Sequence, residues 1–386
     1  MTDLEDVDYI LQHMGEEDLP GHAVSPPIFQ TSIFCFPGFE EFHSAITDEV
    51  NHSLYSRGNN PTVSLVESKI AALEHGERSK LVASGVSAIA HAVMAFVQSG
   101  DHVICVDDTY SWTRVLLTTY LGRFGVSATF VEGRDPSGIE AAIKPKTRLI
   151  YLESPTTFTF KLQDLSAVAA LAKAHGVKTV IDNTWATPIF CNPIDFGIDI
   201  VVHSASKYLG GNSDLIAGVI VGSKADIDLI QKQEFLQLGT VPDPFMAWLL
   251  LRGMRTLHIR MPVHYQNTLA VANYLENQPK VESVLYPMLD SHEDHELARK
   301  QMRGGSGLMS FRLRADRRDQ VVRFTDSLRL FKRAVSWGGY ESLVFPDAVR
   351  YKGDIPGDRL GLVRLHIGLE GADDLVEDLD RSLRLV

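Results

Sequence analysis

Hydrophobic and polar residues follow a regular alternation through the middle of the chain. Between about residues 62 and 222, short apolar runs such as residues 102–106 alternate with segments whose apolar residues recur at helical spacing. This alternation predicts βαβ units. Because the runs are apolar throughout, we expect a mostly parallel sheet that is covered by helices on both faces.

The two ends of the chain have other patterns. Residues 1–60 are rich in Pro, Gly, Phe and His with little periodicity, which predicts an arm that lies on its own domain or reaches a neighbouring subunit. Residues 224–278 have a mainly helical pattern, and shorter strands mix with helices after about residue 281. We therefore predict three parts: the arm over 1–60, a large domain over 61–250 and a smaller α+β domain over 251–386.

Composition and charge narrow the class of protein. The chain has 386 residues, a formal net charge of -12, and 45% hydrophobic and 22% charged residues, which is typical of a globular protein and argues against nucleic-acid binding. Cys35, Cys105 and Cys191 are far apart and odd in number, so we expect no disulfide framework. The acidic start and the lack of a long apolar run predict a cytoplasmic protein without a signal peptide or a membrane span.

The common nucleotide and metal motifs are missing. The chain has no GxxxxGK[ST] sequence and no GxGxxG sequence after a predicted strand. Residues 292–296 read His-Glu-Asp-His-Glu, which lacks the HExxH spacing and is better explained as a solvated helix face. We therefore expect neither a P-loop nor a bound metal.

Four polar positions fall at predicted strand ends, turns or strands, and ligands bind at such ends in open α/β sheets. Ser84-Gly85 begins an apolar helix whose N-terminus favours an anion, although a plain turn would have the same pattern. Asp182 follows a buried strand and suits a cation, a metal, a protonated ring nitrogen or a helix cap. Lys207, between a strand and a Gly-rich turn, is a nucleophile if buried and otherwise a surface lysine. Arg364, in an apolar strand, would bind a carboxylate ligand or form an internal salt bridge.

The order of these four positions is more specific than any one of them. A phosphate-binding turn, an Asp after a strand, a Lys about 25 residues later and a late Arg match the plan of a pyridoxal-phosphate enzyme. In that plan the Asp keeps the pyridine nitrogen protonated, the Lys forms a Schiff base with the aldehyde, and the Arg binds the α-carboxylate of the substrate.

Over nearly its full length the chain resembles the Cys/Met-metabolism pyridoxal-phosphate enzymes. The matching segments are Tyr55-Ser56-Arg57, Asn60-Pro61-Thr62, Ser84-Gly85, Thr109-Tyr110, Asp182-Asn183-Thr184, Ser204-Ala205-Ser206-Lys207-Tyr208, Ser336-Trp337-Gly338-Gly339 and Arg364 through Glu370. The resemblance implies the type I aspartate-aminotransferase-like fold, with pyridoxal 5'-phosphate as cofactor in the large domain. It also implies a homotetramer built from two tight dimers.

The resemblance further implies roles for individual residues. Lys207 would be the Schiff-base lysine, Tyr110 would stack on the cofactor ring, and Tyr55 would be a further catalytic residue. The cofactor-binding residues that it implies are Tyr55, Arg57, Ser84, Gly85, Val86, Tyr110, Asp182, Thr184, Ser204, Ser206 and Lys207, with Tyr55 and Arg57 contributed by the neighbouring subunit. The substrate-binding residues that it implies are Thr157, Ser336, Trp337 and Arg364.

Within the family, several segments are most similar to those of the bacterial cystathionine β-lyases. That similarity predicts a β-lyase that converts cystathionine, or another cysteine S-conjugate, to a thiol, pyruvate and ammonia. Thr157 stands where many members have Asn, and Val335 where several γ-acting enzymes have Glu, which agrees with the β-acting branch.

Two alternatives remain beside this prediction. Within the family, the chain would be a γ-lyase or a γ-replacing enzyme, such as a methionine γ-lyase, a cystathionine γ-lyase or γ-synthase, or a homoserine-ester sulfhydrylase. From a different class, it would be a relative without cofactor that serves as a binding or structural protein. The presence of Lys207, Asp182, Tyr110 and Arg364 argues against that second alternative.

Overall fold

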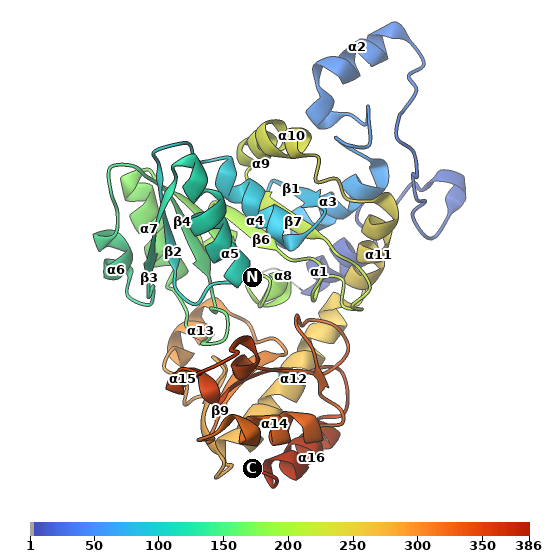
Figure 1. Cartoon of the computed structure of the whole chain (residues 1–386). Coiled ribbons are helices and arrows are strands. Elements are labelled where there is room, and N and C mark those ends of the chain that lie inside the picture. The colour runs from blue at the N-terminus through green and yellow to red at the C-terminus, as the bar shows by residue number, and fades with distance from the viewer. Residues whose placement is uncertain (1–3) are drawn as a thin grey trace.

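The largest sheet of the protein has seven strands in the order β1-β7-β6-β5-β4-β2-β3 (Figure 1). The computed structural model describes residues 4–386. Neighbouring strands from β6 to β3 are parallel, whereas β7 runs antiparallel to β1 and β6, so the predicted mostly parallel sheet is confirmed. The strands are β1 (Arg78–Val82), β2 (His102–Val106), β3 (Ser127–Val131), β4 (Thr147–Glu153), β5 (Lys178–Asp182), β6 (Ile200–His203) and β7 (Gly218–Gly222).

Helices cover both faces of this sheet because successive residues of a strand point to opposite sides. In β2, Val103 and Cys105 pack in one apolar cluster with α4, whereas Ile104 and Val106 pack in another with α3 and α7. The helices around the sheet are α3 (Pro61–Leu73), α4 (Gly85–Met94), α5 (Ser111–Val115), α6 (Pro136–Ala141), α7 (Leu165–His175), α8 (Thr187–Phe190), α9 (Lys224–Ile230), α10 (Leu236–Leu238) and α11 (Pro244–Met254).

A second sheet of five strands, in the order β10-β11-β12-β9-β8, forms the lower part of Figure 1. Its strands are β8 (Val281–Leu285), β9 (Leu308–Leu313), β10 (Lys332–Arg333), β11 (Leu343–Pro346) and β12 (Leu362–His366). Its helices are α12 (Leu257–Glu276), α13 (His295–Gln301), α14 (Arg318–Ser327), α15 (Gly357–Leu360) and α16 (Ala372–Leu383). One apolar cluster continues from the large sheet into this part, so the two sheets share a core. The domain boundaries at 60 and 250 stay a prediction.

The N-terminal segment contains α1 (Leu4–Gln12) and α2 (Phe39–Thr47), and its α2 region projects from the body in Figure 1. The segment exposes large apolar side chains; Phe39, for example, is 77% exposed. Its first helix, α1, lies on its own domain, one of the two expected alternatives, because it packs against α3 and buries Leu11 completely. Within residues 4–386, no helix combines the length and the apolar character that a membrane crossing requires.

Candidate active site

The candidate site lies at the carboxyl edge of the large sheet, where the parallel strands β4, β5 and β6 end. Asp182 is the last residue of β5 and lies beside Glu153, the last residue of β4. The turns that follow β1 and β6 bring Ser84 and Ser204 to the same place. Parallel strands end together, so the fold gathers residues that are far apart in the sequence.

The N-terminus of α4 packs directly on the turn after β6. Ser84 caps α4, and its Oγ accepts a hydrogen bond from the Ser87 N–H at 3.2 Å. A Cβ on Gly85 would lie 2.7 Å from the Cβ of Ser204, so only glycine allows this approach. The predicted strand–turn–helix arrangement is therefore present. Free N–H groups of a helix N-terminus favour an anion.

Lys207 lies in the turn between β6 and β7. Its Nζ donates a hydrogen bond to Ser204 Oγ at 2.8 Å and lies 5.2 Å from the ring centroid of Trp337. Burial lowers the pKa of Lys207 to about 8, although the nearby carboxylate of Asp182 opposes this change. Within residues 4–386, no carboxylate forms an ion pair with this amine. About a tenth of the Lys207 amine is therefore deprotonated at pH 7, far more than of an ordinary lysine, and the deprotonated amine is the reactive form.

Asp182 is held in a fixed orientation by Thr184. The Thr184 N–H donates to Asp182 Oδ1 at 2.9 Å, and the Thr184 hydroxyl donates to the same oxygen. Thr184 Oγ1 in turn accepts from the Ser204 N–H at 2.8 Å. Thr184 therefore connects the Asp182 carboxylate, at the end of β5, to the turn that carries Lys207.

Ser206 has a different environment from the one that a phosphate ligand would give it. Its Oγ accepts from the Ala217 N–H at 2.9 Å and donates to the Ala217 carbonyl at 3.2 Å. The hydroxyl therefore fixes the turn against the start of β7. Val86, which follows Gly85 in α4, is 39% exposed, so this residue lies at the protein surface.

Glu153 is a site residue that the sequence reasoning missed. Its Oε2 accepts from Thr109 Oγ1 at 2.9 Å and from the Tyr110 N–H at 2.7 Å, and Oε1 accepts from the Thr157 hydroxyl. Burial and the adjacent Asp182 raise the pKa of Glu153 to about 7. The signal was available, because Glu153 ends an apolar run in the same way as Asp182 does.

Arg364 lies in β12 and points toward Phe158 and Phe345, whose ring centroids lie 4.8 and 5.3 Å from its guanidinium carbon. Its Nη2 donates to the Ser336 carbonyl at 3.4 Å, which brings the two predicted substrate residues together. Burial lowers the pKa of Arg364 to about 10. In the described part of the chain no carboxylate pairs with it, so the internal salt bridge considered above is absent. The guanidinium is available to a carboxylate ligand.

Tyr55 and Arg57 do not join this group within one chain. Tyr55 is 45% exposed, and the Arg57 guanidinium lies 3.5 Å from Glu49 Oε1 and 5.9 Å from the Tyr55 ring centroid. Both belong to the N-terminal segment that projects from the body (Figure 1). Their predicted contribution to a neighbouring subunit stays a prediction.

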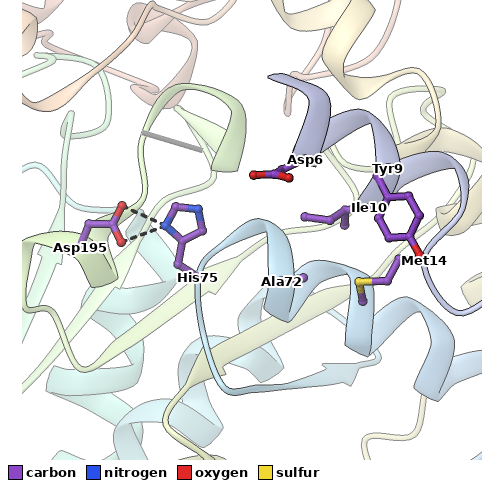
Figure 2. A pocket seen from close by; sticks show the side chains of 7 residues that line it. All are labelled: Asp6, Tyr9, Ile10, Met14, Ala72, His75 and Asp195. Atoms are coloured by element: carbon purple, nitrogen blue, oxygen red, sulfur yellow. Dashed lines mark hydrogen bonds and ion pairs between the residues drawn. The ribbon is translucent and has the colours of Figure 1, made fainter. Parts of the chain in front are cut away.

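A separate hollow of about 760 Å³ opens between α1, the end of α3 and the turn before β6 (Figure 2). His75 Nδ1 lies 2.9 Å from both carboxylate oxygens of Asp195, and Asp6 and Tyr9 line the opposite side. None of its lining residues belongs to the candidate site. Within residues 4–386, no three His, Cys, Asp or Glu side chains are grouped so that they would hold a metal ion.

The chain is similar to known proteins over nearly its whole length. Residues 9–384 match the family described as Cys/Met metabolism PLP-dependent enzyme. L-methionine gamma-lyase of Pseudomonas putida is 40% identical over 372 residues, which cover 94% of this chain and 93% of that protein. Cystathionine gamma-lyase of Bacillus subtilis is 40% identical over 370 residues, which cover 94% of each chain. Cystathionine gamma-synthase of Mycobacterium tuberculosis is 38% identical over 370 residues, which cover 94% of this chain and 92% of that protein.

The names of these relatives bear on the predicted branch of the family. All three are γ-acting enzymes by name, so the expected closeness to the cystathionine β-lyases is not confirmed. The γ-acting alternative of the sequence analysis fits the relatives better. Val335 and Thr157, on which the β-acting branch was predicted, therefore do not decide the position of the broken bond.

Proposed function

The chain belongs to the Cys/Met metabolism family of pyridoxal-phosphate-dependent enzymes, and from this premise we propose that it breaks the Cγ–S bond of a small amino-acid thioether. Cystathionine and methionine have the best support as substrates, because two 40% identical relatives are named for them. Cystathionine and water would give cysteine, 2-oxobutyrate and ammonia. The observation that carries the proposal is Lys207, a buried amine beside Asp182 to which residues 4–386 supply no ion-pair partner.

The residues at the sheet edge fit pyridoxal phosphate. The phosphate would be bound by Ser84, Gly85, Val86 and Ser204, by Ser206 once its hydroxyl turns away from the Ala217 carbonyl, and by Tyr55 and Arg57 of the partner subunit. Asp182, oriented by Thr184, would bind the pyridine N–H, and Tyr110 would lie against the ring. Gly85 supports this fit, because the backbone there is free of a side chain that would fill the space beside Ser204. When bound, the cofactor supplies an electron sink that stabilises negative charge on the substrate Cα.

Lys207 would serve as the proton carrier of the reaction. Cleavage at Cγ requires that a base remove a proton from Cα and then one from Cβ, so the base must reach two positions. The single hydrogen bond of Nζ goes to the neutral hydroxyl of Ser204, and such a partner restrains a lysine less than a carboxylate does. The lowered pKa of Lys207, about 8, makes the free amine accessible near neutral pH.

Two tyrosines would assist as proton donors. Burial and the charge of Asp182 raise the pKa of Tyr110, so its hydroxyl keeps its proton and suits donation to the leaving sulfur. Tyr55 of the partner subunit would be the second such hydroxyl. Both roles are proposed for the assembled enzyme.

Arg364 would bind the α-carboxylate of the substrate, with Ser336 beside it. The guanidinium stacks on Phe158 and Phe345, which limits its movement. Trp337 lies over the Lys207 amine and would form one wall of the site for the thioether chain. Thr157 would face the substrate from the loop after β4, where its hydroxyl donates to Glu153.

Cleavage at Cβ is the second candidate, and Val335 favours it. Several γ-acting members are expected to have a Glu at this position that holds the distal end of the substrate. Here the residue is an uncharged valine that is 73% exposed. A β-lyase would convert cystathionine and water to homocysteine, pyruvate and ammonia.

The test is to supply cystathionine, methionine, cysteine and homoserine esters separately and to identify the keto acid and the thiol. We expect 2-oxobutyrate and cysteine from cystathionine. Pyruvate and homocysteine as the main products would reject the γ-acting proposal in favour of the β-lyase. The Lys207→Ala variant is the control, because it should form neither keto acid.

We also propose that the protein acts in the cytoplasm as a tetramer made of two dimers. The exposed apolar side chains of the N-terminal segment support this, since large exposed apolar surfaces mark interaction sites. Mass measurement in solution tests it, and a monomer at micromolar concentration with full activity would contradict it.

A further inference from the structure

The carboxyl group of Glu153 joins several segments at the sheet edge through hydrogen bonds. Glu153 is 8% exposed and accepts three hydrogen bonds, from Thr109 Oγ1, the Tyr110 N–H and the Thr157 hydroxyl. β4 lies between β2 and β5 in the sheet, so Glu153 lies between the loop after β2 and the end of β5. One side chain therefore connects three segments of the candidate site.

This arrangement has an electrostatic cost. Glu153 and Asp182 are direct neighbours across β4 and β5, and the carboxylate of the half-buried Asp182 repels that of the buried Glu153. The cost is visible in the pKa of Glu153, which burial and Asp182 raise to about 7. A side chain that placed no acceptor here would avoid this repulsion. The two oxygens of Glu153 are therefore better explained by the hydrogen bonds that they accept in the site than by stability alone.

Glu153 holds the part of the loop after β2 that carries Tyr110. Tyr110 precedes α5, and among residues 4–386 the Tyr110 N–H has Glu153 Oε2 as its hydrogen-bond acceptor. The preceding Thr109 hydroxyl donates to the same oxygen. Two donors on one carboxylate oxygen fix the backbone from which the Tyr110 ring extends.

We propose that Glu153 is a positioning residue that fixes Tyr110 against the cofactor ring and Thr157 at the substrate. This inference rests on the proposed function, since Tyr110 is given a role only by a bound cofactor. The two Oε atoms of Glu153 accept the hydrogen bonds that hold Tyr110 and Thr157, and Tyr110 itself would contact the cofactor ring. The backbone N–H of Tyr110 is a hydrogen-bond donor, so it needs an acceptor oxygen at this position.

Three substitutions at Glu153 distinguish the effect of its hydrogen-bond acceptors from the effect of its charge. Glu153→Gln keeps an oxygen for the Tyr110 N–H and can donate its amide to Thr157, whereas Glu153→Ala removes every acceptor. Glu153→Asp keeps the charge but retracts the oxygens by one methylene. Asp199→Asn is the matched control, because Asp199 also accepts from two groups on a neighbouring strand, Thr179 N and Oγ1 at 2.9 and 2.8 Å, but lies at the opposite edge of the sheet.

The experiment measures pyridoxal-phosphate affinity of each apoprotein and the circular dichroism of the bound cofactor, which reports how the ring is held. We expect Glu153→Ala to lose about tenfold or more in affinity and most of the dichroic signal, since it loses more than one hydrogen bond. Glu153→Asp should show the same change to a smaller extent. Glu153→Gln should stay within about threefold of the wild type, and Asp199→Asn should match the wild type in both measurements.

Several outcomes would overturn the inference. Wild-type affinity and dichroism in Glu153→Ala would make Glu153 merely structural, and if that variant does not fold, the same result in Glu153→Asp has the same meaning. A loss in Glu153→Gln as large as in Glu153→Ala would mean that the charge of Glu153, and not its hydrogen-bond acceptance, matters. If the wild-type protein itself binds no pyridoxal phosphate, the proposed function fails and takes this inference with it, whereas the other outcomes leave the proposed function intact.

Discussion

Two regions of the molecule each hold a lysine whose pKa burial lowers, the half-buried Lys207 and the fully buried Lys80, and the surroundings of the two differ. At the carboxyl edge of the sheet, Lys207 has the hydroxyl of Ser204 as its hydrogen-bond acceptor. Under the N-terminal segment, Lys80 of β1 is 1% exposed, and its Nζ donates to the Gly58 carbonyl at 2.8 Å and to Asn59 Oδ1 at 3.1 Å. Lys80 also lies 3.2 Å from Glu67 Oε1 and 4.6 Å from the ring centroid of Phe235.

The comparison separates a reactive lysine from a structural one. Burial lowers the pKa of both lysines. Lys80 is surrounded by acceptors and a carboxylate, which compensate its charge and tie the segment at Gly58 to the body. Among residues 4–386, Lys207 has no ion pair of this kind, and the more distant Asp182 opposes the effect of burial only in part, so burial favours the free amine. Burial of a lysine alone therefore does not indicate chemistry, and the lack of a carboxylate in direct contact is the more useful sign.

The largest effect should come from removing the reactive lysine. Lys207→Ala should lower turnover by about a thousandfold or more, because it removes both the attachment point of the cofactor and the proton carrier. Borohydride reduction of the wild-type holoenzyme followed by peptide mapping should find the pyridoxyl group on Lys207. A label on Lys80 or on any other lysine would reverse the comparison.

Removing the structural lysine should affect stability instead. Lys80→Met leaves Glu67 buried without its partner, which should lower the free energy of unfolding by about 3–5 kcal/mol. Denaturant unfolding measures this, and the visible absorbance of the bound cofactor should be retained in the folded variant. Lys224→Met is the control, since the exposed pair with Asp228 should contribute less than about 1 kcal/mol. Loss of the cofactor band from a stable Lys80→Met protein would contradict the structural role.

The lowered pKa of Lys207 predicts a pH dependence with a definite sign. The folded apoprotein loses this proton near pH 8, whereas an unfolded lysine keeps it to about pH 10.4, so between these values the unfolded state binds more protons. Stability therefore gains from this group as the pH rises, by roughly 1–3 kcal/mol in total. Compared with Lys207→Met, the wild-type apoprotein should be less stable at neutral pH, and the difference should shrink toward pH 10.

The same pKa governs attachment of the cofactor. The rate at which the wild-type apoprotein attaches pyridoxal phosphate should rise with pH and level off above about 8. A stopped-flow absorbance measurement would show this. A rate that keeps rising to pH 10 would mean that Lys207 keeps the pKa of an ordinary exposed lysine.

The smallest expected effect is a partial recovery of activity, and it tests whether the N-terminal segment anchored by Lys80 contributes to the site of a neighbouring subunit. If Arg57 of one subunit completes the site that contains Lys207 of the other, then mixing inactive Arg57→Ala and Lys207→Ala proteins should restore about a quarter of the wild-type activity, because half of the dimers would be hybrids with one intact site each. Separately tagged subunits allow the hybrids to be purified and assayed. Verified hybrids without activity would contradict a shared site.

The sequence determined the sheet and most of the candidate site. Apolar runs between helical segments predicted the parallel strands, because strands buried on both faces must be apolar throughout. Ser84, Asp182, Lys207 and Arg364 were found from residue type and position, since each is a polar group at an end or inside of an apolar run. The resemblance to a known family added the substrate residues, but it pointed to β-acting enzymes where the relatives are named for γ-chemistry.

Tertiary structure alone decided which buried charges are compensated. Lys80 and Lys207 both stand beside apolar runs, and nothing in the sequence shows that the first meets Glu67 and Gly58 while the second meets Ser204 and Trp337. Glu153 and Asp182 are likewise 29 positions apart in the chain, and the register of β4 and β5 makes them neighbours. The cause is physical: the pKa and the role of an ionisable group depend on what surrounds it within a few ångströms, and long-range strand pairing, which local sequence does not encode, sets those surroundings.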